Sequence, residues 1–170
     1  MIGQSQVVEI LRPWLGTRML PYLENTAASV RQMLCAWKIT QPLFPLADGI
    51  RLCLYSAVRR ITGGRMTVLP DAGRPVTMVT EDFDVLTDEL LYLLFSRFPV
   101  DTEHMGILWD YGMKSGSLSA FKVLYLRFGT LIGESDRQSL TRVLTAYPSF
   151  RLRGWFPEGD PLPPQKRTML

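Results

Sequence analysis

The amino-acid sequence predicts a compact domain that mixes helices with strands, and three observations support this prediction. The chain has 170 residues, 46% of them apolar, which is enough to bury one hydrophobic core. Several segments carry apolar residues three and four positions apart, as amphipathic helices do. Two β-rich runs, residues 65–69 and 75–80, flank a turn that contains proline, aspartate and glycine, so a hairpin is expected there. We expect one globular domain over residues 1–156 and a mobile, proline-rich tail over residues 157–170.

The first elements are expected to be a strand, an irregular connection and a helix. Residues 6–11 contain β-branched side chains and stop before Pro13, which predicts a short strand near an edge. After the irregular connection, Asn25 or Thr26 can cap a helix whose apolar residues recur at helical spacing. That helix should end before Pro42.

A proline-bounded loop and a second helix should follow. In the loop over residues 41–45, Leu43 and Phe44 either fold onto the core or contact a membrane or a partner, and the core is favoured. Residues 46–61 carry a helical pattern of apolar and basic side chains. The pair Gly63-Gly64 should stop this helix, because glycine readily adopts the positive φ that closes a helix.

Residues 84–98 are ambiguous between two secondary structures. A helix capped near Thr87 and an unbroken buried strand are equally compatible with this apolar run. Asp101 should cap a short helix that extends through Tyr111.

The remaining elements are two helices and a strand. Ser117 or Ser119 should cap a helix that reaches Phe128, with Lys122 and Arg127 outward or snorkelling. A further helix is expected from Ser135, with Leu140, Val143, Leu144 and Tyr147 buried. Residues 149–156 alternate arginine with aromatic or aliphatic side chains, which is typical of a half-buried strand.

Catalytic chemistry is not expected from these residues. The chain has one histidine, His104, and two cysteines, Cys35 and Cys53, which lie in apolar helical patterns and favour free thiols in a reducing compartment. Asp82 and Asp84 could lie on one side of a strand, as the carboxylates of a hydrolase would, but solvated turn carboxylates are favoured. No nucleophile elbow, zincin motif or nucleotide loop is present, so we predict neither an enzyme nor a cofactor or metal site.

Membrane contact, if it occurs, should be peripheral. Charges or prolines interrupt every apolar run before it reaches the length of a spanning helix. The N-terminus also lacks the basic and apolar segments of a secretory signal.

Charge is distributed in three blocks along the chain. Residues 1–80 carry nine basic and four acidic side chains, residues 81–110 one basic and eight acidic, and residues 111–170 nine basic and four acidic. Such blocks can offer complementary faces to copies of the chain and basic faces to phosphates, although solvated surfaces without a partner fit equally well. The candidates for phosphate contact are Arg59, Arg60, Arg65, Arg151 and Arg153. The candidates for self-association are Asp82, Asp84, Asp88, Glu89, Leu43 and Phe44.

The C-terminal segment supports two further hypotheses. Arg151 and Arg153 alternate with aromatic residues, a pattern that suits nucleic acid as well as an anionic membrane. The alternative to a structural role is an accessory interaction module that binds a host factor through these arginines and the tail.

A stretch in the second half of the chain resembles the matrix proteins of rhabdoviruses, the vesiculovirus type in particular. The shared pattern is an apolar segment, an acidic connection, a Trp-Asp-aromatic element, a serine-containing linker, and a helix with Phe at its start and Phe-Gly at its end. In this chain these are Leu90 to Phe98, Asp101 to Glu103, Trp109-Asp110-Tyr111, Lys114 to Ser117, Phe121 and Phe128-Gly129. A weaker correspondence around residues 27–30 and 50–54 extends the likeness to about half the chain.

The resemblance implies both a fold and a function. The fold would be a single compact α+β domain, with an antiparallel sheet packed against several helices and a strand over Leu90 to Phe98. The function would be that of a viral structural protein that self-associates, binds anionic lipid at the inner face of the envelope and condenses the nucleocapsid. Such a protein would be found in the virion, in the host cytoplasm and at the inner face of membranes. The chain lacks the lysine-rich N-terminal tail and the Pro-Pro-x-Tyr budding motif of this family.

Overall fold

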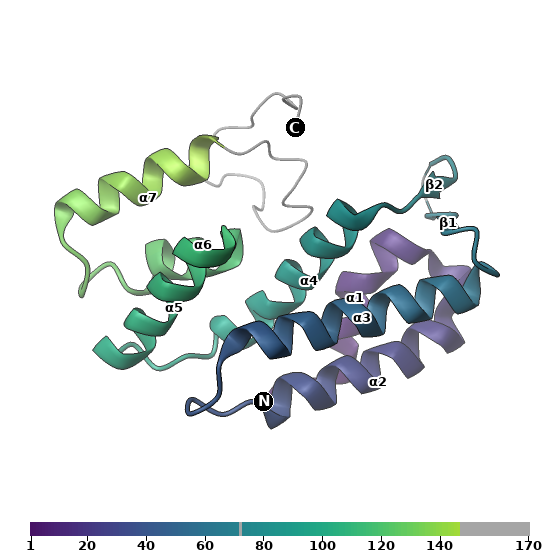
Figure 1. The fold of residues 1–170 in the computed structure, drawn as a ribbon, viewed down its shortest axis with the longest axis horizontal. Helices are drawn as coiled ribbons and strands as arrows, with labels where there is room; N and C mark the ends of the chain where they lie inside the picture. The colour runs from purple at the N-terminus through teal and green to yellow at the C-terminus, as the bar shows by residue number, and fades with distance from the viewer. Residues whose placement is uncertain (72, 147–170) are drawn as a thin grey trace. The chain divides into compact units, whose positions relative to one another are not determined.

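The computed structural model of the chain describes residues 1–71 and 73–146, and 72% of these residues are helical (Figure 1). Strands β1 (Thr67–Val68) and β2 (Val76–Thr77) form a small antiparallel sheet. The predicted mixture of helices with an antiparallel sheet is therefore confirmed in this coarse form. A larger sheet packed against helices is not present among the residues that the structure describes. The chain divides into two compact units, Met1–Leu94 and Phe95–Leu170.

The first predicted strand is wrong, because its residues belong to helix α1 (Gln4–Leu15). Val7, Leu11 and Trp14 are buried and recur at spacings of four and three, so they form one face of a helix. Pro13 lies in the last turn of α1 and does not prevent helix formation upstream.

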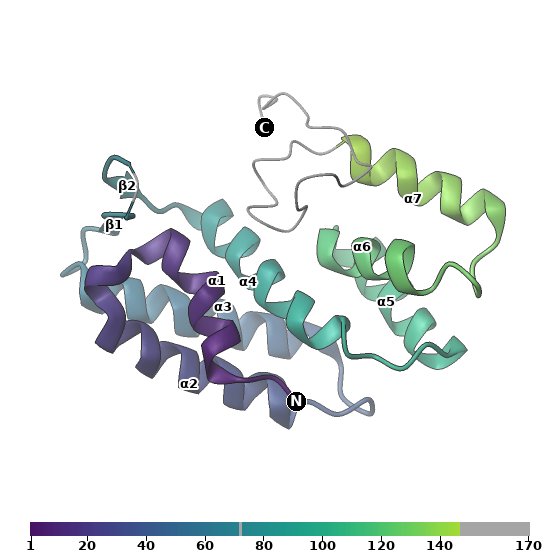
Figure 2. The ribbon, with the colours of Figure 1, turned by 180° about the vertical axis from the view of Figure 1, so that it is seen from behind.

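The second helix begins earlier than its predicted caps. After the short 3-10 helix η1 (Thr17–Met19), α2 (Leu20–Ala36) starts with Pro21 in its first turn. Proline is favourable there because the first helical N–H groups have no partner within the helix. In Figures 1 and 2, α1, α2 and α3 lie side by side, and short connections make successive helices antiparallel.

Helix α3 (Leu43–Ile61) begins within the predicted apolar loop over residues 41–45. Leu43 is buried in the core, as favoured from the sequence, whereas Phe44 is exposed. The predicted stop is confirmed, since Gly63 and Gly64 follow the helix with φ of +62° and +85°.

The predicted hairpin is confirmed in the same unit. Thr67 pairs with Thr77 and Val68 with Val76. The turn is attached to the end of α1, because Gly16 lies so close to Leu69 that a Cβ at Gly16 would be 2.4 Å from the Leu69 carbonyl oxygen.

Helix α4 (Thr80–Phe95) corrects the strand that the family resemblance implied for Leu90 to Phe98. Phe83, Leu86 and Leu90 are buried at three- and four-residue spacing, which is the periodicity of a helix face. The apolar run is therefore the buried face of a helix that begins well before it.

The second unit starts with two helices whose predicted caps are confirmed. Asp101 caps α5 (Thr102–Ser115) and Ser117 caps α6 (Leu118–Arg127), each accepting a hydrogen bond from the backbone N–H three residues on, at 2.7 and 3.1 Å. Gly116 ends α5 in the left-handed conformation, with φ of +72°.

Helix α7 (Glu134–Ala146) completes the described part of this unit. Lys122, predicted to point outward or to snorkel, is buried, because residues 118–124 of α6 are all buried and leave its first turns no solvent side. The predicted Tyr147 contact and the strand over residues 149–156 lie outside the described residues. The apolar core of the unit comprises Phe95, Phe98, Leu108, Tyr111, Phe121, Leu124, Phe128, Leu140 and Leu144.

Candidate anion-binding surface

One end of the first unit collects arginine side chains from four segments. Helices α1 and α3 both finish at this end, and the hairpin is attached there to η1 (Figure 1). Cations at the last turn of a helix are favoured by the negative C-terminal end of the helix dipole. We call this surface the basic end, and its members are Arg12, Arg18, Arg59, Arg60, Arg65 and Arg74.

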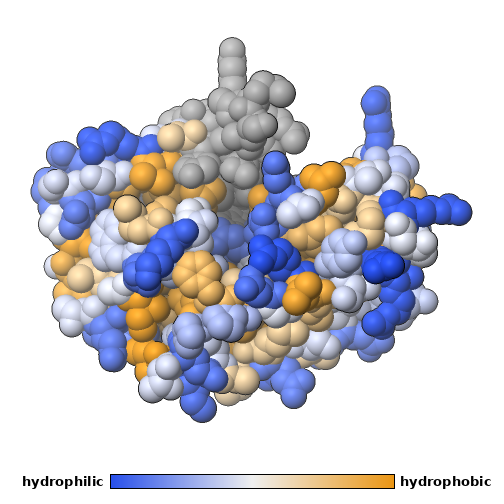
Figure 3. Space-filling view, in the orientation of Figure 1, coloured by the Kyte–Doolittle hydropathy of each residue, from blue (hydrophilic) through white to orange (hydrophobic). Residues whose placement is uncertain are grey.

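The six arginines of the basic end are exposed and make no side-chain hydrogen bond or ion pair within the described part of the chain. Figure 3 shows several strongly hydrophilic side chains at this end of the unit, among less polar ones. Other arginines are engaged within the chain. Those that donate side-chain hydrogen bonds include Arg31, Arg51, Arg127, Arg137 and Arg142. The guanidinium groups of the basic end are therefore available for an external anion.

Asp71 positions the hairpin within the basic end. Its carboxylate accepts a hydrogen bond from the Thr17 backbone N–H (2.6 Å) and another from the Thr17 hydroxyl. These two bonds, the hydroxyl bond first, lower the pKa of Asp71, and the charges of Arg12 and Arg18 lower this pKa further. The carboxylate thus stays ionised and fixes the turn that carries Arg74.

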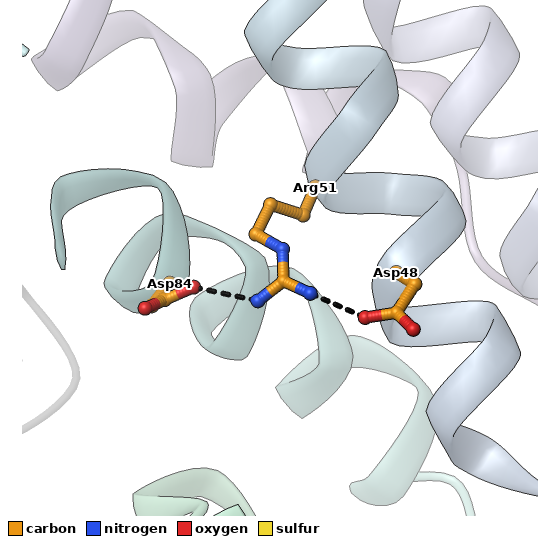
Figure 4. Close-up of polar contacts among 3 residues, drawn as sticks. All are labelled: Asp48, Arg51 and Asp84. Carbon is orange, nitrogen blue, oxygen red and sulfur yellow. Dashed lines mark hydrogen bonds and ion pairs between the residues drawn. The ribbon is translucent and has the colours of Figure 1, made fainter. Parts of the chain in front are cut away.

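The predicted acidic candidates do not form one acidic surface. Asp84 pairs with Arg51 at 2.9 Å, and Arg51 also contacts Asp48 of its own helix (Figure 4). Asp82 instead accepts a hydrogen bond from the backbone N–H of Val79, at 2.9 Å. The suggestion that Asp82 and Asp84 share one side of a strand is therefore wrong, because two positions apart on a helix they point in different directions.

Two further acidic candidates lie on the same helix. Glu89 is buried, and its Oε2 accepts a hydrogen bond from the indole N–H of Trp14 at 3.2 Å. Asp88 is half-buried. Burial removes Glu89 from any exposed contact surface, as it does Leu43, so Phe44 is the exposed member of the predicted apolar pair.

Outside the basic end, the titratable side chains with shifted pKa values include Cys53 and Asp101. Among residues 1–71 and 73–146, no three histidine, cysteine, aspartate or glutamate side chains are grouped to hold a metal ion. Burial raises the pKa of the Cys53 thiol, with a smaller lowering by the charge of Arg60, and this favours the unreactive thiol form. The pKa of Asp101, a helix cap, is lowered by a hydrogen bond from the backbone N–H of His104 and, to a smaller extent, by one from the His104 side chain. In the part of the chain that the structure describes, no helix has both the length and the apolar composition to cross a membrane.

The structure brings together three of the five predicted phosphate candidates and adds three others. Arg59, Arg60 and Arg65 lie at the basic end, whereas Arg151 and Arg153 lie outside the described residues. The additional arginines are Arg12, Arg18 and Arg74. The order of the helices is the sequence signal that could have identified these additional arginines. Three successive antiparallel helices place the C-terminal ends of the first and the third on the same side.

Comparison with known proteins gives no independent indication of function. No family model matches the chain, and no curated protein and no solved structure matches it.

Proposed function

We propose that this chain is a non-catalytic structural protein of the viral matrix type. It associates with copies of itself, and it binds phosphate-bearing partners through its basic end. The partners would be an anionic membrane surface and the viral nucleocapsid, beneath the envelope and in the host cytoplasm. The observation that carries the proposal is the set of six exposed arginines without side-chain partners among the described residues. The fold gives the proposal no support, because Leu90 to Phe98, which the family resemblance implied to be a strand, is mostly helical.

The physical argument is electrostatic. Six guanidinium groups at one end of a helical unit raise the local positive potential, and phosphate groups accept paired hydrogen bonds from arginine. Each arginine near an anionic bilayer contributes about 1 kcal/mol of binding free energy. Three of them therefore account for about 3 kcal/mol, or about a hundredfold in affinity.

Vesicle co-sedimentation tests the membrane arm of the proposal. The full chain is expected to bind vesicles that contain phosphatidylserine and not vesicles of phosphatidylcholine alone, and to dissociate as salt rises. The combined change Arg60→Ala, Arg65→Ala and Arg74→Ala should weaken binding by about a hundredfold. Arg142→Ala is a control that removes an exposed arginine from α7 in the other unit.

A matched titration with single-stranded RNA tests the nucleocapsid arm. Binding to RNA alone, with a steep dependence of affinity on salt, would favour a nucleic-acid-binding role over the membrane. Failure to bind either anion, or equal binding by the triple variant, would refute the basic end as a contact surface.

Removal of residues 157–170 separates the structural role from the alternative of an accessory module. Assembly and anion binding should survive the removal if the helical units carry them. Loss of all partner binding would instead support the tail as the ligand of a host factor.

A further inference from the structure

The outward face of α3 carries four exposed side chains in line. Asp48, Leu52, Tyr55 and Arg59 are spaced by four, three and four residues, so at about 100° per residue they fall within a sector of about 60°. The exposed fractions are 59% for the Asp48 side chain, 64% for Leu52 and 43% for Tyr55. The opposite face of α3 is buried and comprises Leu43, Ile50, Leu54 and Val58. We call these four exposed residues the α3 stripe, in which the ring of Tyr55 also lies edge-on to the buried Phe83 of α4, with centroids 5.5 Å apart.

The α3 stripe is complementary to itself when two copies run antiparallel. Its spacing is symmetric about a point between Cys53 and Leu54, so a two-fold axis there places Leu52 opposite Tyr55 of the other copy. The same axis places Asp48 opposite Arg59 of the other copy, and each contact occurs twice. A parallel pairing would instead bring identical charges together, and it would align the two helix dipoles unfavourably.

The charged ends of the stripe are able to form these contacts. The Oδ1 atom of Asp48 contacts Arg51, whose other nitrogen binds Asp84 (Figure 4). Two carboxylates around one guanidinium leave one surplus negative charge at this end of the stripe. At the other end, Arg59 has no side-chain hydrogen bond or ion pair among the residues described. Opposite charges are therefore separated along one exposed helix face.

We propose that α3 forms a two-fold symmetric contact with α3 of a second copy of this chain, through the α3 stripe. The proposal rests on the self-association in the proposed function and names the surface responsible for it. The occupant is a second copy because the spacing of the stripe is the same in both directions along the helix, while the charges at its two ends are opposite. Contact between two single helices is smaller than a standard protein interface of about 1,600 Å², so the dimer should dissociate on dilution.

Charge reversal with rescue tests the contact in the full chain. Arg59→Asp and Asp48→Arg should each raise the dimer dissociation constant by at least about tenfold, measured by sedimentation velocity over a range of concentrations. The double variant should return to within about threefold of the original chain, because each dimer again contains two Asp–Arg pairs. Arg142→Asp is the matched control, since it makes the same change of charge at an exposed arginine of α7 that belongs neither to the α3 stripe nor to the basic end.

Cysteine cross-linking provides a second measurement that does not depend on charge. In a Cys35→Ser, Cys53→Ser background, a mixture of Leu52→Cys and Tyr55→Cys chains should form a mixed disulfide faster than either chain pairs with itself. Faster pairing of each variant with itself would refute the antiparallel contact.

The outcomes distinguish this contact from self-association in general. Undiminished association of the Arg59→Asp and Asp48→Arg variants would overturn the α3 contact and leave the proposed self-association standing. A chain that stays monomeric at every concentration would overturn both.

Discussion

A close contact between α5 and α6 gives the sharpest prediction for the fold. Gly112 is buried in α5, and a Cβ at this position would lie 2.7 Å from Cε1 of Phe121 in α6 and 3.1 Å from two more atoms of that ring. Carbon atoms do not approach this closely without a shift of the neighbouring group. The ring of Phe121 is itself buried and lies edge-on to Trp109, with centroids 6.5 Å apart. Gly112→Ala should therefore destabilise the second unit.

The magnitude follows from two opposing effects. Alanine is favoured over glycine inside a helix by about 1 kcal/mol, and overpacking of a filled core costs about 1–3 kcal/mol. Gly112→Ala should thus lower the free energy of unfolding by about 0–2 kcal/mol. Gly106→Ala in the same helix is the control, because a Cβ at Gly106 has no atom within 4 Å and should gain the full helix preference.

Thermal unfolding followed by circular dichroism can measure this difference. For a chain of this size, 1 kcal/mol shifts the melting temperature by about 2–4 °C, so the two variants should shift it in opposite directions or differ by several degrees. Amide exchange should place the change in α5 and α6. Phe121→Leu should reduce the cost of Gly112→Ala in the double variant, since it removes the ring edge. Equal stabilisation by Gly112→Ala and Gly106→Ala would refute the close approach of the two helices.

Two further predictions concern the hairpin and α7. The folded-state pKa of Asp71 lies below its unfolded value, so this carboxylate contributes stability above about pH 4 that is lost as the pH falls through the folded-state pKa. Amide exchange at Thr17, corrected for its intrinsic rate, should therefore accelerate at low pH, and Asp71→Asn should accelerate it at neutral pH; unchanged protection in that variant would refute the contact. Gly129→Ala would place a Cβ 2.8 Å from Nη1 of Arg137 and displace this side chain from Tyr125, at a cost of about 0.5–1 kcal/mol. Gly133→Ala, whose Cβ meets no atom within 4 Å, should leave exchange in α7 unchanged, and equal effects of the two variants would contradict this prediction.

Local signals in the sequence were sufficient where neighbouring residues determine the structure. The caps at Asp101 and Ser117, the stop at Gly63-Gly64 and the hairpin between residues 65 and 80 are all confirmed. Each depends on a side chain or a backbone conformation that acts within a few residues. Such local signals therefore predict the structure correctly without knowledge of the tertiary packing.

Errors arose where two periodicities fitted the same short apolar run. Residues 6–11 and Leu90 to Phe98 were both compatible with strands, and both are helical apart from the last three residues of the second run. β-Branched composition favoured a strand in the first case, and the family resemblance favoured one in the second. Both segments form helices because their apolar residues, at spacings of three and four, can be buried together on one face only in a helix.

The candidate site was predictable only in part for a related reason. Arg59, Arg60 and Arg65 are close in sequence and were identified from it, but Arg12 and Arg18 join them only because α1 and α3 run in the same direction. Asp84 and Glu89 looked like exposed acids, and the fold pairs one with Arg51 and buries the other beside Trp14.

The sequence alone therefore determined where several helices start and stop, the absence of a recognisable catalytic motif, and the blocks of charge along the chain. The tertiary structure decided which charges are satisfied internally and which remain exposed, because that depends on the direction and facing of helices far apart in sequence. It also showed that the four residues of the α3 stripe are exposed on one face of the helix. Whether a charged side chain holds the fold together or remains available to a partner is decided by packing, which brings distant groups within hydrogen-bonding distance.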